Sequence, residues 1–183
     1  MEKSNLKPFL RNNLDILFVG LNPAKGSSDN RHYFSVNQAF WNQLYNSGLI
    51  TKPVDKMVAD NIIFGSNAFN LNGCNYGITD LITEIAESDS KKINPSVNDV
   101  KRLIELIDKY KPKIAVILHG KVLSNLFNYL GKTKPTSNQG FVGKILPNAD
   151  TLFYAIAFPH GNAISSDKKI KNYRLIYEKL RII

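Results

Sequence analysis

A short apolar run, Ile-Leu-Phe-Val at residues 16–19, limits the fold of this chain more than any other feature. The run stops at Gly20 and is followed by Asn22-Pro23. Uninterrupted apolar runs of this length are typical of parallel-sheet strands that are buried on both faces. In open sheets of this kind, ligands bind just beyond the carboxyl ends of the strands. Gly20 and Pro23 therefore predict a turn that holds the amide of Asn22 at that edge.

The rest of the chain alternates predicted strands with predicted helices. This order predicts an α/β fold, a three-layer α/β/α sandwich with a central, mainly parallel four-stranded sheet. We expect residues 1–183 to form a single domain, because no repeat or linker divides them. A polar loop is expected at 25–35, and a long loop or a hairpin at 131–150. The other expected strands are 77–82, 114–118 and 151–158. The expected helices are 37–47, 53–63, a long helix that Ser96 caps and Pro112 breaks, 122–130 and 167–181.

Composition narrows the class of protein. The single cysteine, Cys74, excludes an internal disulfide framework and a cysteine-ligated zinc site. No apolar stretch approaches the roughly 18 residues that span a bilayer, and the N-terminus lacks the apolar stretch of a signal peptide. We therefore expect a cytoplasmic location and no membrane partner. Twenty-four Lys and Arg against fifteen Asp and Glu give a net charge of +9, which suits either nucleic-acid binding or a merely solubilising surface.

Polar side chains follow all four predicted strands: Asn22, Thr79-Asp80, His119 and His160-Gly161-Asn162. No glycine-rich phosphate loop follows the first strand, so no nucleotide cofactor is expected. The three histidines are not spaced as metal ligands, so no metal is expected either. No serine sits in a nucleophile elbow. An amide, a carboxylate, an imidazole and an aromatic loop remain, which suit a planar heterocycle that is stacked, hydrogen-bonded and attacked by water.

Several of these segments resemble the uracil-DNA glycosylase superfamily. Gly20-Leu21-Asn22-Pro23 resembles its first motif, and looks most like the mismatch-specific uracil/thymine branch, where Gly-Ile-Asn-Pro-Gly is typical. Residues 33–41, Tyr-Phe-Ser-Val-Asn-Gln-Ala-Phe-Trp, are similar to that branch's aromatic loop and helix. Residues 76–81 and 119–121 are similar to the ends of its second and third strands. The resemblance spans about residues 14 to 181.

Two departures from the family pattern concern the motifs themselves. Ala24 stands where the branch usually has glycine. The second motif, Asn-Pro-Ser-Gly or His-Pro-Ser in the family, is absent as such. Residues 160–165 align with the pattern His-Pro-Ser-Pro-Leu-Ser, which makes His160 the matching imidazole. An alignment shifted by two residues places Phe158 there instead and removes that role.

The resemblance implies a monofunctional DNA glycosylase for base-excision repair. Such an enzyme flips uracil or a related deaminated or damaged base out of DNA and uses water as the nucleophile, with no metal or cofactor. The implied partner is DNA with a damaged or mismatched base, and we expect a monomer. The implied catalytic residues are Asn22, which positions the water, Asp80, as general base or electrostatic stabiliser, and His160, which hydrogen-bonds the leaving base. The implied base-binding residues are Leu21, Phe34, Tyr33 and Asn162, and the implied DNA-binding residues are Ala163, Ile164, Ser165, Lys168 and Lys169.

Each role has a structural alternative. Asn22 also suits turn stabilisation, Phe34 a core aromatic, and Asp80 a helix cap or an ion pair, while His119 is expected to play a structural part. Two other functions also stay open. One is a nucleic-acid-binding module of the same fold that has lost the chemistry, and the other is a doubly wound protein that binds some other small anion.

Overall fold

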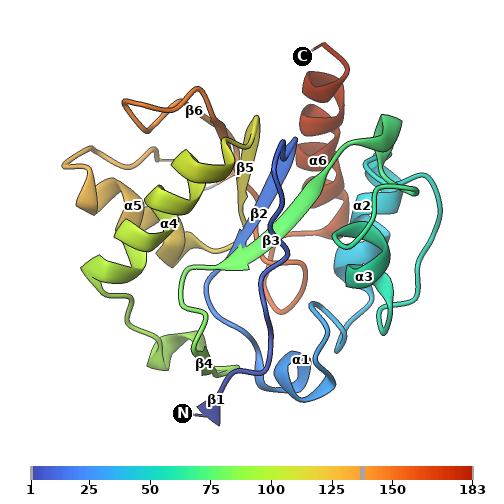
Figure 1. The fold of residues 1–183 in the computed structure, drawn as a ribbon, viewed down its shortest axis with the longest axis horizontal. Coiled ribbons are helices and arrows are strands. Elements are labelled where there is room, and N and C mark those ends of the chain that lie inside the picture. Colours follow the sequence, from blue (N-terminus) through green and yellow to red (C-terminus); the bar gives the residue numbers. More distant parts are fainter. Residues whose placement is uncertain (1, 137–138, 183) are drawn as a thin grey trace.

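The computed structural model describes residues 2–136 and 139–182, and its centre is a five-stranded sheet (Figure 1). The strand order is β3-β2-β5-β7-β6. Four neighbouring strands are parallel: β3 (Tyr76–Asp80), β2 (Ile16–Gly20), β5 (Ile114–Ile117) and β7 (Leu152–Ala155). These are the four strands that the sequence predicts, so the α/β class and the mainly parallel sheet are confirmed.

The fifth strand, β6 (Gly140–Gly143), corrects the predicted number of four. It lies in the segment 131–150, expected as a loop or a hairpin, and pairs antiparallel with β7. A bulge interrupts the pairing between Phe141 and Gly143, and the ring centroids of Phe141 and Tyr154 lie 5.2 Å apart. The sequence gives only a weak signal for β6, which has one aromatic residue among glycines. Whether such a segment forms a strand depends on β7, which is already in the sheet.

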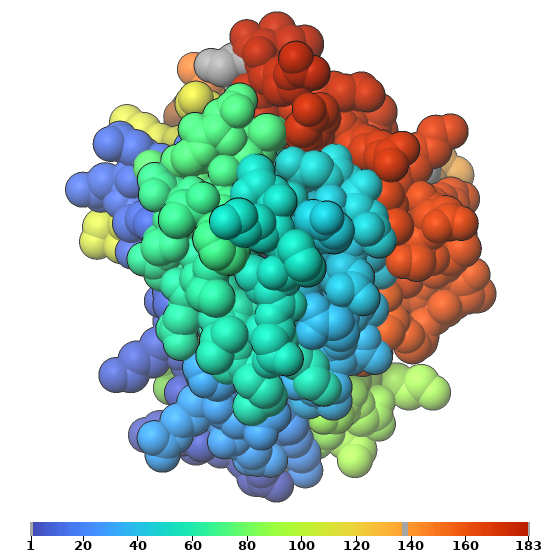
Figure 2. All heavy atoms as spheres, turned by 90° about the vertical axis from the view of Figure 1, so that its right-hand side faces the viewer, coloured from blue at the N-terminus to red at the C-terminus, as the bar shows by residue number. Residues whose placement is uncertain are grey.

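Helices cover both faces of the sheet, which confirms the three layers. Ile16 and Phe18 of β2 point to one face and pack in the same cluster as residues of α2 (Ala39–Ser47), α3 (Ala59–Ile63) and α6 (Ser166–Leu180). Leu17 and Val19 point to the other face, toward α4 (Val97–Tyr110) and α5 (Gly120–Tyr129). The alternation follows from the two-residue period of a strand. Figure 2 shows the side of the molecule that α2, α3 and α6 cover.

Several short elements were not expected. α1 (Lys25–Asn30) lies in the predicted polar loop, and the pair β1 (Glu2–Lys3) and β4 (Ile85–Ala86) forms a separate two-stranded sheet. Two single 3-10 turns, η1 (Leu71–Gly73) and η2 (Ser90–Lys92), complete the described elements.

The predicted helix at 53–63 is shorter in the structure, and the predicted helix after Ser96 is capped as expected. α3 begins only at Ala59, because the Asp55 carboxylate accepts the Met57 N–H at 2.8 Å and turns the backbone before it.

At the start of α4, Ser96 Oγ accepts the Asp99 N–H and Asp99 Oδ2 accepts the Ser96 N–H. Across the described ranges, no helix combines the length and the apolar character that crossing a membrane requires.

Candidate active site

A cavity of about 360 Å³ opens at the carboxyl edge of the parallel strands. This volume falls in the range of small-molecule pockets. The carboxyl ends of β2 and β3 lie side by side there, because Gly20 pairs with Asp80. Residues that end or follow the parallel strands line the cavity: Gly20, Leu21, Asn22, Pro23, Ala24, Asp80, His119, Phe158, His160, Gly161 and Asn162. Other segments add Leu6, Ser27, Tyr33, Phe34, Glu87, Ser88 and Ser90.

The Asn22 side chain is held in one orientation by two backbone carbonyls. Its Nδ2 donates to the Pro23 oxygen at 2.9 Å and to the Glu87 oxygen at 2.8 Å. Two acceptors around one end of the amide place the nitrogen there, so the other end is the oxygen. Asn22 Oδ1 accepts no hydrogen bond from residues 2–136 and 139–182. It is therefore an oriented acceptor on the cavity wall, suited to a water molecule.

Asp80 is a buried carboxyl that lacks the hydrogen bonds such a group usually has. Its residue is 5% exposed, and Oδ2 is buried with no hydrogen-bond partner in the described part of the chain. Burial disfavours the charged form and raises the pKa of Asp80 to about 7, while the positive charge of Arg102 lowers it. The Arg102 guanidinium also donates to the carbonyls of Asp80 at 2.6 Å and Leu81 at 2.9 Å. The arrangement produces a carboxyl that titrates near neutral pH.

Gly20 makes room for this carboxyl. A Cβ atom at position 20 would collide with Asp80 Oδ1, which lies across the paired strands. Glycine at the end of β2 is therefore required by close approach of a side chain, which explains why the apolar run stops there.

The aromatic loop between α1 and α2 forms a second wall. Phe34 has a left-handed backbone, with φ 53°, and its ring stacks on Phe40 with centroids 4.0 Å apart. The Phe158 ring lies 6.0 Å from Phe34 at 44°. Tyr33 is 4% exposed, and burial together with the charge of Asp80 raises its pKa. The wall thus offers ring faces and edges for a planar ligand.

Two imidazoles line the cavity, and their surroundings differ. His119 caps α5: its Nδ1 accepts the Lys121 N–H at 3.1 Å, so in the neutral ring the proton is on Nε2. Burial and the charge of Lys121 lower the pKa of His119. His160 is exposed as a residue, and the centroids of its ring and the Phe158 ring lie 5.1 Å apart. Partial burial of the ring lowers the pKa of His160, and the charge of Lys169 lowers it further. Both shifts favour the neutral form of the ring, and His119 has its tautomer set by the fold.

The family model described as the Uracil DNA glycosylase superfamily matches residues 8–181 of the 183-residue chain. The chain belongs to this superfamily. Its members are DNA glycosylases, hydrolases that act on DNA. The match extends over all the parallel strands and over every residue of the cavity except Leu6.

Most of the predicted site residues of this superfamily member come together in the cavity. They are Asn22, Asp80, His160, Leu21, Phe34, Tyr33 and Asn162. The amide of Asn162, however, is used within its own loop: Nδ2 donates to the Phe158 carbonyl at 2.8 Å, and Oδ1 accepts the Ile164 N–H at 3.1 Å. Asn162 therefore shapes the loop beside the cavity.

The predicted DNA-binding residues are divided by the structure. Ala163 and Lys168 are exposed, Ile164 is half-buried, and Ser165 caps α6 by accepting the Lys168 N–H. The structure differs from the prediction at Lys169. This residue is 2% exposed, and its ammonium donates to the Pro159 carbonyl at 3.1 Å. The Lys169 ammonium is therefore hydrogen-bonded inside the protein and does not lie at the surface, because α6 places this residue beneath the loop that precedes the helix.

Sequence reasoning missed several contributors to the site. His119, which the sequence assigns a structural part, does cap α5, and it also lines the cavity. Glu87, whose carbonyl holds Asn22, belongs to the segment after β3, where no motif marks it. Arg102 is one basic residue on an amphipathic helix, and nothing in its local sequence shows that it reaches the end of β3.

Proposed function

We propose that this chain hydrolyses the bond between deoxyribose and uracil, or a related deaminated base, in DNA, as a member of the mismatch-specific uracil/thymine branch or a close neighbour of it. One observation carries the proposal. A buried carboxyl with a pKa near 7 shares a cavity with an asparagine whose amide oxygen is oriented and unoccupied. Those are the two groups needed to activate and to place a water molecule.

Base recognition requires that the nucleotide leave the helix. A base flipped from the duplex would enter the cavity and lie against the ring of Phe34, next to Tyr33 and Phe158. Stacking on an aromatic ring is worth roughly 1–3 kcal/mol per base. Phe34 is itself stacked on Phe40, so its ring is already ordered before the base arrives.

The reaction uses water as the nucleophile. Water would donate one hydrogen bond to Asn22 Oδ1 and lose its other proton to the Asp80 carboxylate, while its oxygen bonds to the sugar C1′. The bond from C1′ to the base breaks, and its electron pair leaves with the base. The Asp80 charge also stabilises the positive charge that develops on the sugar. Because the base form of Asp80 is needed, the rate is expected to rise as pH increases through about 7.

The departing base carries negative charge, which a neutral imidazole can stabilise by donating a hydrogen bond. His119 is the better placed of the two rings, because the cap contact leaves its proton on Nε2. His160, the residue matched to the family's second motif, is the other donor. We expect His119→Ala to reduce base release more than His160→Ala does.

The test is base release from oligonucleotides that carry uracil opposite G, opposite A or unpaired. Hypoxanthine, xanthine and ethenocytosine are run in parallel, with EDTA present and alkali used to reveal abasic sites. Asn22→Ala should abolish release. Asn67→Ala is the matched control, because Asn67 is exposed and its Nδ2 also donates to a carbonyl, that of Gly73, outside the cavity.

Two outcomes would contradict the proposal. A folded protein that binds DNA but releases none of these bases would be a nucleic-acid-binding module that has lost the chemistry. Release that survives in Asn22→Ala and in Asp80→Asn would place the chemistry elsewhere. Salt-sensitive DNA binding would in either case argue against a site for a small anion alone.

A further inference from the structure

We propose that Asp60, together with His32, is a positioning residue of this site, which holds the loop of residues 31–35 so that Tyr33 and Phe34 form the cavity wall. Asp60 lies on α3, outside the cavity, and no motif marks it. The kinetic consequence rests on the proposed function. The effect on the loop itself does not, and it can be measured separately.

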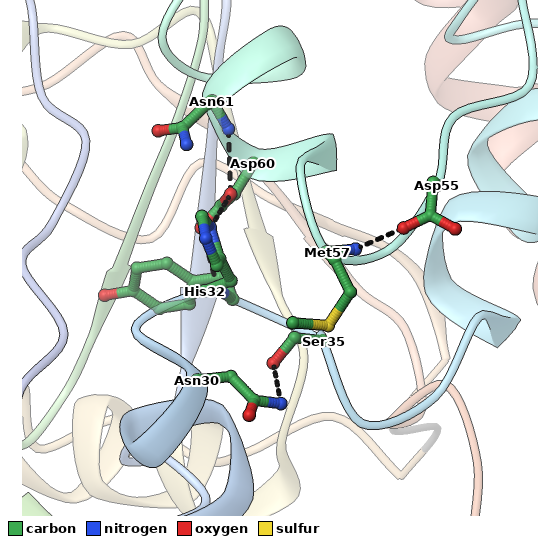
Figure 3. A network of polar contacts seen from close by, with 8 residues as sticks. Asn30, His32, Ser35, Asp55, Met57, Asp60 and Asn61 are labelled. Atoms are coloured by element: carbon green, nitrogen blue, oxygen red, sulfur yellow. Dashed lines mark hydrogen bonds and ion pairs between the residues drawn. The ribbon is translucent and has the colours of Figure 1, made fainter.

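Asp60 is a buried carboxylate with three donors. It is 1% exposed, and its Oδ1 accepts from His32 Nδ1 and from the Asn61 N–H, both at 2.8 Å. Its Oδ2 accepts the Tyr33 N–H, also at 2.8 Å. Figure 3 shows the His32 ring and the backbone nitrogen of Asn61 in contact with this one carboxylate. Two of the three contacts connect α3 to a loop about 28 residues earlier in the chain.

The loop needs such an anchor. Arg31 and Phe34 both have left-handed backbones, with φ 60° and 53°, although neither is glycine. Side chains rarely adopt this conformation, and it persists only where the surroundings impose it. The ends of the loop are also joined by a hydrogen bond from Asn30 Nδ2 to Ser35 Oγ at 3.1 Å (Figure 3). The middle of the loop, however, is held from outside by Asp60.

The anchor acts on base binding and not on proton transfer. Tyr33 and Phe34 belong to the loop, whereas Asn22 and Asp80 belong to the ends of β2 and β3. Releasing the loop therefore removes the stacking wall and leaves the water-activating pair in place. A loss of this kind raises KM more than it lowers kcat.

The experiment compares Asp60→Asn with Asp55→Asn. Asp55 is exposed, accepts the nearby Met57 N–H at 2.8 Å, and loses the same charge on substitution (Figure 3). In Asp60→Asn an amide NH₂ faces N–H donors, so at least one contact is lost. We expect kcat/KM for base release to fall on the order of tenfold or more through KM, because a hydrogen bond to a charged group is worth about that factor. Asp55→Asn should stay within about twofold of the wild type.

Rescue separates positioning from a general loss of structure. His32→Asn keeps an N–H donor near the position of Nδ1, and should behave like the wild type. His32→Leu removes that donor and should follow Asp60→Asn. Thermal unfolding shows that each variant is folded at the assay temperature. Should Asp60→Asn not fold, His32→Leu, which removes one donor of three, carries the same comparison.

A second readout is independent of catalysis. Trp41 is the only tryptophan, is 1% exposed, and lies edge-on to the Phe34 ring with centroids 6.2 Å apart. We expect Asp60→Asn and His32→Leu to change its emission and increase its quenching by acrylamide, and Asp55→Asn to change neither.

The outcomes separate this inference from the proposed function. Unchanged Trp41 fluorescence in Asp60→Asn would overturn the anchor, whether or not the wild type releases a base. Changed fluorescence in a protein that releases no base would uphold the anchor and reject the proposed function. A fall in kcat with unchanged KM and a shifted pH profile would also overturn it, because Asp60 would then act on the chemistry.

Discussion

Two buried aspartates, Asp80 and Asp60, show opposite ways of placing a carboxyl inside this protein. Both are almost inaccessible, at 5% and 1% exposure. Asp60 accepts three N–H groups, while Asp80 Oδ2 has no partner within the described ranges and the pKa of Asp80 is raised to about 7. The effect of burial on a carboxyl therefore depends on the N–H donors that surround it.

We expect the hydrogen-bonded carboxylate of Asp60 to contribute to stability and the carboxyl of Asp80 to contribute to reactivity. A carboxylate that accepts several N–H groups holds together the segments that carry them. A carboxyl without donors is costly to ionise, and for that reason it can take a proton from water near neutral pH. The fold places the satisfied carboxyl beneath the aromatic loop and the unsatisfied one at the cavity.

The largest expected effect is loss of activity in Asp80→Asn. If Asp80 is the general base, base release should fall by roughly 10²–10⁴-fold, because the amide cannot accept the proton of water. Initial rates at pH 8, with enzyme in excess over substrate, measure this. A loss smaller than tenfold would show that Asp80 acts only on the electrostatics of the sugar or not at all.

The next effect is on stability and concerns the other carboxylate. Asp60→Ala should lower the free energy of unfolding by about 3 kcal/mol, because the N–H groups of the buried Tyr33, the half-buried His32 and the exposed Asn61 lose their acceptor. Urea unfolding at pH 7 measures the change, and Asp55→Ala is the control. If the two variants were equally stable, the contrast between Asp60 and Asp80 would lose its basis.

A smaller effect of opposite sign is expected from the stability of Asp80→Asn. The folded pKa of Asp80 is raised above its ordinary value of 3.8, so the folded state binds more protons between pH 4 and 7, and the stability of the wild type falls as pH rises through that window. Asp80→Asn removes this fall in stability with rising pH. The shift of about three pKa units corresponds to about 4 kcal/mol at pH 8, and burial of the asparagine amide without partners offsets part of it. The variant should therefore be more stable than the wild type by on the order of 2 kcal/mol at pH 8, and the gain should vanish near pH 4. Thermal unfolding from pH 4 to 8 measures it, and a gain that did not depend on pH would refute the assignment.

The smallest expected effect comes from Arg102→Met. Loss of the guanidinium charge should raise the pKa of Asp80 further, so that the rate at pH 7 falls a few-fold and the high-pH rate is kept. The pH profile of base release measures this. Arg174→Met is the matched control, because Arg174 also donates to a backbone carbonyl, that of Asn46, away from the cavity. An unshifted profile would limit Arg102 to its hydrogen bonds with the end of β3.

The parts of the site that lie next to the strands could be predicted from the sequence. Asn22, Asp80 and His160 follow strands whose apolar runs are readable, and parallel strands bring their carboxyl ends to one edge. Lys169 and Asp60 could not be predicted. Whether a lysine reaches solvent or a carbonyl depends on the loop packed above it, and the contacts of Asp60 join segments that no local pattern relates.

By itself, the sequence determined the order of the four parallel strands and of the main helices, the sheet edge at which the polar strand ends meet and the superfamily motifs, because periodicity, glycine and proline act over a few residues. Only the tertiary structure decided that Asp60 accepts three hydrogen bonds and that Asp80 Oδ2 accepts none from the described residues. It also decided the tautomer of His119 and the fifth strand. Those features depend on donors and acceptors within about 3 Å of one another that come from distant parts of the chain, and hydrogen bonds and burial depend on such distances.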